Sequence, residues 1–303
     1  MSLSRTEQRL REALRGDVRR GEPMARHTSF RIGGPADLFV TCDTLADLKD
    51  ALQILGEDGI EWTVVGRGSN LLVGDGGYRG AVVTLGSEFR SHAVDGERIK
   101  AGAACALAYI VQDAFSRGLG GLEFAVGIPG TLGGALVMNA GSRDVWMELV
   151  VESVTVLDRS GALIRVRGRD ITWGYRRSDL PGRGTVVEAV LRLHAAEKAT
   201  IRAGMQSSLE RRKATQPMGV PSAGSVFANP AGDSAGRLIE ECGFKGFRQG
   251  GARVSDVHAN FIVNEGGATA EDVARLMATI QTTIRDRYGI ELTPEIRFLG
   301  AFD

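Results

Sequence analysis

Two glycine-rich segments, residues 66–71 and residues 127–141, have the composition of loops that closely approach a phosphate or a flat ring. The first follows a predicted strand, and its two glycines allow successive backbone N–H groups to turn toward one anion. In the second, Gly133 and Gly134 present no side chain that would hold off a ligand. The first segment alone also fits a plain tight turn. Both together indicate an extended ligand with a diphosphate, such as a dinucleotide.

Two common phosphate-binding signatures are absent from the sequence. No Gly-Lys dipeptide occurs, so there is no Walker A loop. Residues 66–71 match the first two glycines of the dinucleotide fingerprint G-x-G-x-x-G, but Leu71 stands where the third is required. The sequence therefore does not support a Rossmann fold.

Further motifs accompany the two glycine-rich segments along the chain, and together they lie at residues 27–34, 65–72, 127–141, 174–178, 223–230, 250–255, 258–264 and 292–298. In this order, from about residue 24 to residue 300, they resemble the motifs of the UDP-N-acetylenolpyruvoylglucosamine reductase (MurB) family. The glycine-rich segments resemble its FAD-binding elements, and the later motifs resemble its active site. The short tract between Ser178 and Ser225 resembles the more compact second type of this family.

The resemblance implies an α+β fold with an FAD-binding domain of the vanillyl-alcohol-oxidase (PCMH) type. That domain has two α+β subdomains and is followed by a C-terminal α+β substrate-binding domain. We expect an N-terminal helical arm over residues 1–22, the FAD-binding domain over residues 23–196 and the substrate-binding domain over residues 197–303. The extreme C-terminal strand is expected to contribute to the active site.

The resemblance also implies FAD as the cofactor and NADPH as the hydride donor. The contexts of His27 and His92 do not compel a covalent link, so we expect noncovalent FAD. The predicted cofactor-binding residues are Gly66, Arg67, Gly68, Ser69, Asn70, Leu71, Gly127, Ile128, Pro129, Gly130, Thr131, Gly133, Gly134, Ala135, Asn139, Ala140 and Gly141.

The implied reaction is the reduction of UDP-N-acetylglucosamine-enolpyruvate to UDP-N-acetylmuramate in peptidoglycan precursor synthesis. Hydride addition leaves negative charge that spreads into the substrate carboxylate, so the site needs charge-stabilising donors and an acid. Within the resemblance, Arg176 holds the carboxylate, Glu295 assists as a buried acid with a raised pKa, and Ser225 protonates carbon. Tyr175, Lys213 and Asn229 are candidates for binding the UDP-sugar.

Each catalytic candidate has a structural alternative when it is taken by itself. Arg176 also fits a salt bridge, Glu295 an edge strand and Ser225 a turn of small residues. Lys213 also fits the solvated end of a charged helix, and His258 is expected to be structural. For the whole chain, the alternatives are an oxidase of a hydroxy acid or sugar with the same fold, and a non-enzymatic flavin- or nucleotide-binding module.

The spacing of apolar residues and the residues typical of helix ends predict the helices and strands that position these residues. Thr44 and Thr269 are predicted N-caps, the latter with Asp272 in capping-box position. Helices are predicted over residues 5–19, 45–55, 104–117, 199–213, 233–242 and 269–288. Strands are predicted over residues 37–41, 61–65, 81–85, 98–101, 153–158, 163–167, 185–193, 261–264 and 295–299. The order lacks a clean βαβ alternation, which favours an α+β fold.

Composition limits the remaining possibilities. Lys plus Arg and Asp plus Glu both number 37 in 303 residues, so nothing indicates a nucleic-acid or membrane partner. The three scattered cysteines, Cys42, Cys105 and Cys242, favour neither a disulfide framework nor a cysteine-based metal site. We expect a cytoplasmic protein with a small-molecule substrate, without a metal and without an obligate protein partner.

Overall fold

The computed structural model describes residues 2–142 and 145–302, and its internal contacts divide the chain into two units. Met1 of the expected arm and Asp303 of the expected substrate-binding domain lie outside the described residues. Unit 1 comprises Met1–Arg19, Leu38–Gly66 and Ala81–Arg211, and unit 2 comprises Arg20–Asp37, Arg67–Gly80 and Arg212–Asp303. Each unit thus gathers distant parts of the sequence. The domain boundaries predicted after residues 22 and 196 remain predictions.

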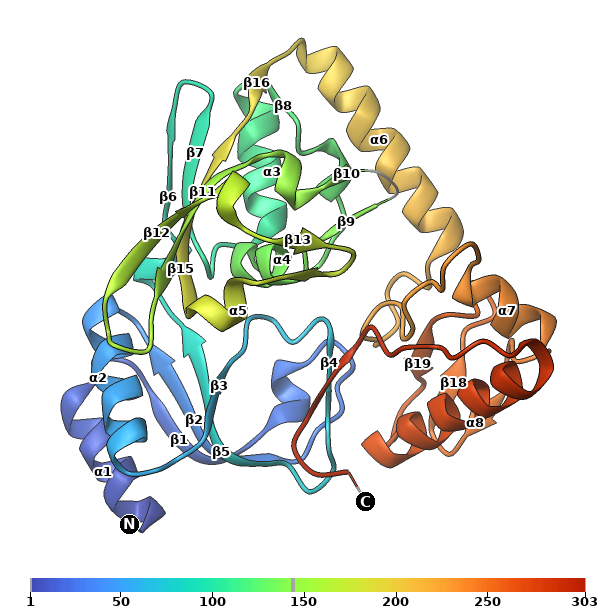
Figure 1. Ribbon diagram of the computed structural model, residues 1–303, viewed down its shortest axis with the longest axis horizontal. Coiled ribbons are helices and arrows are strands. Elements are labelled where there is room, and N and C mark those ends of the chain that lie inside the picture. The colour runs from blue at the N-terminus through green and yellow to red at the C-terminus, as the bar shows by residue number, and fades with distance from the viewer. Residues whose placement is uncertain (1, 143–144, 303) are drawn as a thin grey trace. The chain divides into compact units, whose positions relative to one another are not determined.

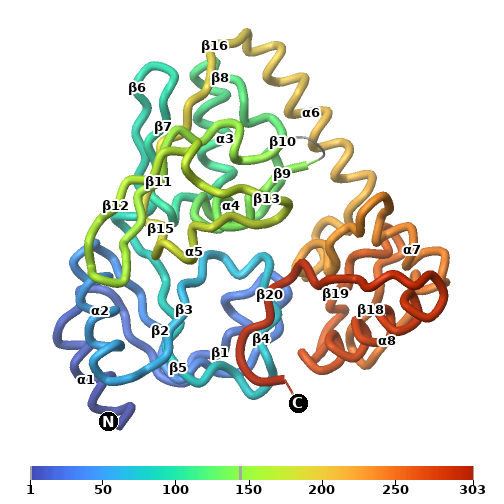
Figure 2. The backbone as a smooth tube through the Cα atoms, in the orientation of Figure 1, coloured from blue at the N-terminus to red at the C-terminus, as the bar shows by residue number. Residues whose placement is uncertain are grey.

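Figures 1 and 2 show the helices and strands of both units. The helices are α1 (Leu3–Ala13), α2 (Leu45–Glu57), α3 (Leu107–Ser116), α4 (Leu132–Val137), α5 (Leu180–Arg183), α6 (Lys198–Thr215), α7 (Ala235–Glu241) and α8 (Ala270–Tyr288). Short 3-10 turns lie at Met24–His27, Glu88–Arg90, Glu123–Ala125, Met147–Leu149 and Gly168–Asp170. Within the described residues, no helix combines the length and apolar character that a membrane span needs.

The predicted N-caps of α2 and α8 are confirmed. Thr44 accepts a hydrogen bond from the Asp47 backbone N–H at 3.0 Å, and Thr269 accepts one from Asp272 at 3.0 Å. Both helices have the reciprocal bond of a capping box, which satisfies two otherwise unpaired N–H groups. Helix α8 ends at Gly289, whose φ of +68° is favourable for glycine.

A five-stranded antiparallel sheet forms the centre of unit 1. Its order is β12 (Leu163–Arg167), β11 (Val151–Leu157), β15 (Thr185–Arg192), β7 (Arg98–Gly102) and β6 (His92–Asp95). The predicted hairpin of β11 and β12 is confirmed, with Leu157 opposite Leu163. Helices α3 and α4 both contact β7 and lie on the same side of this sheet (Figure 1). They place the second glycine-rich segment beside the sheet.

A second sheet has the order β1 (Val18–Pro23), β2 (Pro35–Cys42), β5 (Tyr78–Leu85) and β3 (Trp62–Val64). Strands β3 and β5 are parallel, with Trp62 opposite Ala81. The division between the two units falls inside β1, β2 and β5. Three two-stranded pairs complete unit 1: β8 (Leu119–Gly120) with β16 (His194–Ala195), β9 (Gly141–Ser142) with β10 (Val145–Trp146), and β13 (Trp173–Gly174) with β14 (Arg177–Ser178).

The helix predicted over residues 5–19 is wrong beyond Ala13, because β1 begins at Val18. Leu10 is fully buried and Val18 is 2% exposed, and both belong to the apolar core of unit 1. Thr6 donates its hydroxyl to Asp58 at 2.7 Å, which joins α1 to the end of α2. Burial of these apolar side chains outweighs the helical tendency of the charged sequence.

Unit 2 is built on a three-stranded antiparallel sheet of β17 (Arg248–Gln249), β18 (Ala252–Val254) and β19 (Ile262–Asn264). Helix α8 contacts β17 and β18, and α7 contacts α8. Strand β4 (Leu71–Val73) pairs in parallel with β20 (Arg297–Leu299). The strand predicted from residue 295 therefore begins two residues later. The mixture of helices and strands agrees with the α+β expectation.

Candidate active site

The second glycine-rich segment contains helix α4, which the glycine content of residues 127–141 does not predict. Thr131 is the N-cap of this helix, and its Oγ1 accepts a hydrogen bond from the Gly134 N–H at 3.4 Å. The Gly133 N–H donates to the main-chain oxygen of Ala103 at 2.8 Å. These bonds hold the segment against the chain that precedes α3.

Gly66, at the start of the first glycine-rich segment, lies against Thr131. A Cβ atom on Gly66 would stand 2.7 Å from the Thr131 Oγ1, closer than side chains approach one another. A Cβ on Gly134 would meet only the same oxygen, at 3.6 Å, and Gly134 is exposed. Neither Gly66 nor Gly134 carries a side chain where the two segments meet, and the Thr131 hydroxyl lies beside both glycines. This arrangement fits a flat cofactor with a diphosphate, such as FAD.

Strands β13 and β14 form a tight hairpin whose turn residues are Tyr175 and Arg176. Arg176 has a φ of +55°, a conformation that residues other than glycine rarely adopt. Its Nη1 donates a hydrogen bond to the main-chain oxygen of Gly141 at 2.9 Å. Its guanidinium carbon lies 5.2 Å from the ring centroid of Trp146 and 5.5 Å from that of Tyr175. Cation–π contacts and the hydrogen bond thus hold Arg176 beside the second glycine-rich segment.

Asn139 connects this hairpin to the second glycine-rich segment. It is only 2% exposed, and its φ is +40°. Its Nδ2 donates to the main-chain oxygen of Gly174 and to the Glu148 carboxylate, both at 3.2 Å, while its Oδ1 accepts the Glu148 N–H at 3.1 Å. The side chain is therefore used inside the protein, and a contact between Asn139 and FAD remains a prediction.

The first glycine-rich segment continues into unit 2. Gly68 has a φ of +61°, and a Cβ there would lie 2.1 Å from the main-chain oxygen of His27, so only glycine fits. Asn70 donates its Nδ2 to the main-chain oxygen of Glu295 at 3.1 Å, and the Arg297 N–H donates to the main-chain oxygen of Asn70 at 2.9 Å. Unit 2 thus places this segment beside the chain that carries Glu295.

Ser225 lies in unit 2, on the extended segment that neighbours the one carrying Glu295. It forms an antiparallel bridge with Phe261, and the next residue, Val226, accepts the Glu295 N–H at 2.9 Å. Ser225 and Glu295 are both half-buried. The structure therefore brings these two predicted catalytic residues onto neighbouring extended segments. The protonated state expected of Glu295 remains a prediction.

Asn260 is a supporting residue that the sequence analysis missed. It is 3% exposed, accepts the Phe227 N–H at 3.0 Å and donates to the Phe227 oxygen at 2.7 Å. Its side chain thereby fixes the extended segment that carries Ser225. The residue types around Asn260, which lies between His258 and Phe261, do not predict this role. Trp146, which packs against Arg176, was missed for the same reason.

His258 has surroundings that agree with its structural interpretation. Its Nδ1 accepts the Asn260 N–H at 3.1 Å, and a Cβ on Gly236 would lie 2.9 Å from its Cε1. Burial lowers the pKa of His258, and the nearby Lys245 charge lowers it further, whereas Glu240 raises it. The ring is therefore neutral near pH 7 and serves as a hydrogen-bond acceptor.

The substrate-binding candidates lie in both units. Tyr175 is 45% exposed in the hairpin turn of unit 1. Lys213 is exposed on the part of α6 that belongs to unit 2. Asn229, also exposed in unit 2, accepts the Ala235 N–H at 3.1 Å and thereby holds the start of α7. Their contacts with a substrate remain predictions.

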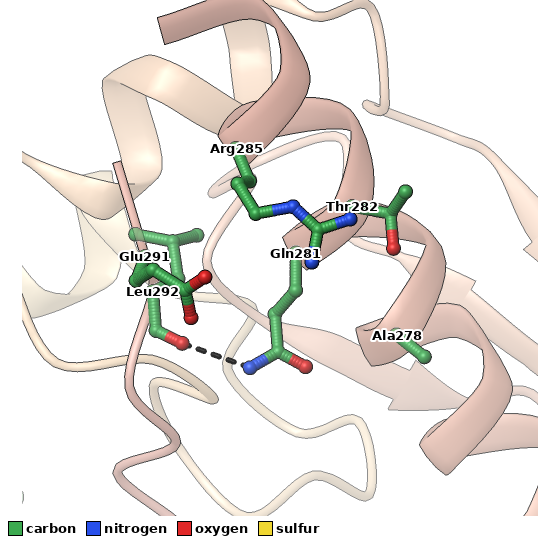
Figure 3. Close-up of a pocket in the computed structure, with 6 residues that line it drawn as sticks. All are labelled: Ala278, Gln281, Thr282, Arg285, Glu291 and Leu292. Carbon is green, nitrogen blue, oxygen red and sulfur yellow. Dashed lines mark hydrogen bonds between the residues drawn. The ribbon is translucent and has the colours of Figure 1, made fainter. Parts of the chain in front are cut away.

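A small depression of about 200 Å³ lies on the surface of α8 in unit 2 (Figure 3). Its lining residues are Ala278, Gln281, Thr282, Arg285, Glu291 and Leu292. None of them is a predicted site residue. Gln281 donates its Nε2 to the main-chain oxygen of Leu292 at 2.8 Å, three residues before Glu295. Gln281 thereby helps to hold the segment that carries Glu295, and nothing links the depression itself to the predicted site.

Known proteins resemble the chain along nearly its whole length. A model described as "FAD binding domain" matches residues 36–167, and one described as "UDP-N-acetylenolpyruvoylglucosamine reductase, C-terminal domain" matches residues 216–299. UDP-N-acetylenolpyruvoylglucosamine reductase 2 of Symbiobacterium thermophilum is 46% identical over 98% of both proteins. The chain belongs to the UDP-N-acetylenolpyruvoylglucosamine reductase family. The reductase of Bacillus subtilis is 40% identical over 97% of both chains.

The solved structure of the UDP-N-acetylenolpyruvylglucosamine reductase from Thermus caldophilus has the same fold. It superposes with a TM-score of 0.82 and 37% identity, over 94% of this chain and 99% of that one. An alkyldihydroxyacetonephosphate synthase shares the fold alone, with a TM-score of 0.50 and 16% identity over 64% of this chain and 41% of that one. The expected reductase-family membership and the FAD-binding fold are thus confirmed.

FAD is the cofactor of this member of the reductase family, as predicted. The matched FAD-binding model spans both glycine-rich segments, residues 66–71 and 127–141. The glycines without side chains at Gly66 and Gly134, beside the Thr131 hydroxyl, fit that cofactor.

Proposed function

We propose that the protein reduces the enolpyruvyl double bond of UDP-N-acetylglucosamine-enolpyruvate to give UDP-N-acetylmuramate, a step of peptidoglycan precursor synthesis. It thus acts as a UDP-N-acetylmuramate dehydrogenase. FAD, when bound, supplies hydride that originates from NADPH. One observation carries the proposal: Asn70 of a cofactor segment is bonded to Glu295, which is bonded in turn to the segment of Ser225. The names of relatives up to 47% identical support the same activity.

Arg176 stabilises the charge that develops during reduction. Hydride joins the terminal alkene carbon, and the electron pair of the double bond moves to the carbon that carries the carboxylate. Charge then spreads into that carboxylate, which the planar guanidinium of Arg176 holds by paired hydrogen bonds. The contacts of Arg176 with Gly141, Trp146 and Tyr175 orient the guanidinium before the reaction. Such preorganisation is a main source of transition-state stabilisation.

Ser225 completes the reaction by proton transfer. Its hydroxyl donates a proton to the carbon next to the carboxylate and later regains one from solvent. Glu295, in its carboxylic acid form, donates a hydrogen bond to the same substrate carboxylate. Both roles require groups held on a rigid frame, and the bond between Glu295 and Val226 supports this requirement.

The proposal also covers how the substrate is bound and where in the cell the protein works. Tyr175, Lys213 and Asn229 bind the UDP-sugar, whose diphosphate suits a cation and an amide donor. The substrate is a small molecule, and the protein works in the cytoplasm. The free cysteines Cys42, Cys105 and Cys242 support a reducing location.

An assay with purified protein tests this function. FAD-loaded protein should oxidise NADPH beyond the single equivalent that reduces its flavin only when UDP-N-acetylglucosamine-enolpyruvate is present, with one UDP-N-acetylmuramate formed for each further NADPH consumed. Flavin-loaded protein that ignores this substrate but is reduced by a hydroxy acid or sugar would establish the oxidase alternative instead. Protein that does not take up FAD would contradict both.

A further inference from the structure

Ser29 joins the first glycine-rich segment to the turn that leads to Ser225. Its backbone N–H donates to the main-chain oxygen of Gly68 at 3.3 Å. Its hydroxyl donates to the main-chain oxygen of Ser222 at 2.7 Å. One residue thus bonds to a predicted FAD-binding residue and to the chain three residues before the predicted proton donor, all within unit 2.

The chain around Ser29 is rigid enough to transmit this constraint. The Thr28 hydroxyl donates to the Ile32 oxygen at 2.9 Å and closes the turn, in which Arg31 has a φ of +56°. Phe30, which follows Ser29, is fully buried in the core of unit 2. The Asn264 side chain donates to the Phe30 oxygen at 3.0 Å. Ser29 therefore projects from a fixed support.

The turn that receives the Ser29 hydroxyl contains a flexible position. Gly224, between Ser222 and Ser225, has a φ of +81°, and a Cβ there would meet no atom within 4 Å. Beyond Ser225, Asn260 and Phe261 hold the chain in the extended form. Before Gly224, the hydroxyl of Ser29 supplies a side-chain bond that holds the turn.

We propose that Ser29 is a positioning residue for Ser225. Its hydroxyl fixes the turn of residues 222–225 in register with the first glycine-rich segment, so that the Ser225 hydroxyl meets the carbon that receives the proton. This inference rests on the proposed function. Because the main-chain bond between Asn264 and Pro221 remains in a Ser29→Ala variant, at 2.9 Å in the structure, that variant should fold while its turn loosens.

The test compares Ser29→Ala with Ser29→Thr, which keeps a hydroxyl, and with Ser91→Ala. Ser91 is the matched control because its hydroxyl also donates to a main-chain oxygen at 2.7 Å, that of Glu88 in unit 1. Stopped-flow absorbance follows flavin reduction by NADPH and flavin reoxidation by the enolpyruvyl substrate, in H₂O and in D₂O. Amide hydrogen exchange over residues 222–226 reports the turn without any turnover.

In Ser29→Ala, reoxidation should slow about tenfold to a hundredfold, because small misplacements of reacting groups have effects of this size. Its solvent isotope effect should increase, since proton transfer becomes more rate-limiting, while flavin reduction stays within about twofold. Exchange over residues 222–226 should rise, Ser29→Thr should recover most of the rate, and Ser91→Ala should match the wild type.

Unchanged reoxidation, an unchanged isotope effect or an equal slowing of both half-reactions in Ser29→Ala would overturn the proposal. Unchanged hydrogen exchange would overturn it independently of any substrate. A wild-type protein whose flavin the substrate fails to reoxidise would instead contradict the proposed function. The two failures are therefore distinguishable.

Discussion

The side-chain amide of Asn70 donates a hydrogen bond to the main-chain oxygen of Glu295, across 3.1 Å. The Arg297 N–H returns a bond to the main-chain oxygen of Asn70, and the Glu295 N–H reaches Val226. A segment predicted to bind the cofactor, a candidate acid and the segment of the candidate proton donor are therefore consecutive members of one hydrogen-bonded frame. A change at Asn70 should consequently disturb both flavin binding and the reduction of the substrate.

Ser225→Ala should separate the two halves of the catalytic cycle. Flavin reduction by NADPH needs no proton from Ser225 and should stay within about twofold of wild type. Flavin reoxidation by the enolpyruvyl substrate should fall by about 10²-fold or more, the usual contribution of a general acid. Single-turnover absorbance measures both rates. Equal losses in the two half-reactions would rule out the proton-donor role.

Gly134→Ala should weaken FAD binding without harming the fold. A Cβ at Gly134 meets only the Thr131 Oγ1, at 3.6 Å, and alanine is favoured over glycine in a helix by up to ~1 kcal/mol. We expect the flavin-free protein to melt at the same temperature or higher, and the FAD dissociation constant to rise about tenfold, or ~1.4 kcal/mol. Flavin fluorescence and thermal unfolding measure the two effects.

Gly56→Ala is the matched control for that substitution. Gly56 lies in α2 with open space around it, so alanine there should stabilise the helix and leave FAD affinity unchanged. If Gly134→Ala bound FAD as tightly as the control, the cofactor would not lie over Gly134.

Asn139→Ala should destabilise the protein by about 2–4 kcal/mol, because it leaves buried partners of the amide unsatisfied. Asn139→Gly loses the same bonds but tolerates the φ of +40° better, so it should be about 1 kcal/mol more stable than the alanine variant. Urea unfolding of the FAD-free protein measures both. Equal stabilities for the two variants would mean that the left-handed backbone at residue 139 carries no strain.

Stability should fall as the pH decreases below about 6.5, the ordinary pKa of histidine, in part because of His258. Burial lowers the pKa of His258 in the folded state, so in this pH range the unfolded chain binds more protons. The contribution of His258 to stability is complete above its pKa in the unfolded chain. It is lost as the pH falls from there through its lower pKa in the folded protein. Urea unfolding from pH 5 to pH 8 should show a shallower decline for His258→Gln, and identical slopes would exclude His258 as the cause.

Local signals in the sequence predicted much of this fold. The capping residues Thr44 and Thr269 were correct because a capping box satisfies its hydrogen bonds within four residues. The hairpin of β11 and β12 was correct because its strands alternate and its turn contains glycine. The family resemblance then supplied the site residues, which residue type alone left open.

Other features depend on contacts that no local pattern encodes. Helix α4 was missed because Gly133 and Gly134 disfavour helices, and bonds to the preceding chain hold it in place. The helix predicted over residues 5–19 failed because tertiary burial of Val18 favours a strand. The role of Asn260 depends on Phe227, 33 residues away, and is visible only in the folded chain.

The parallel pairing of β4 with β20 has a consequence for the order in which the protein can be made. Leu71 and Arg297 are partners, so the first glycine-rich segment cannot reach its final bonding until residues near 299 have left the ribosome. Strand β4 therefore remains without its partner strand through most of translation. The five-stranded sheet of unit 1, by contrast, can be complete once residue 192 has emerged. A nascent chain would thus complete the bonding of this predicted cofactor-binding segment only at a late stage of synthesis.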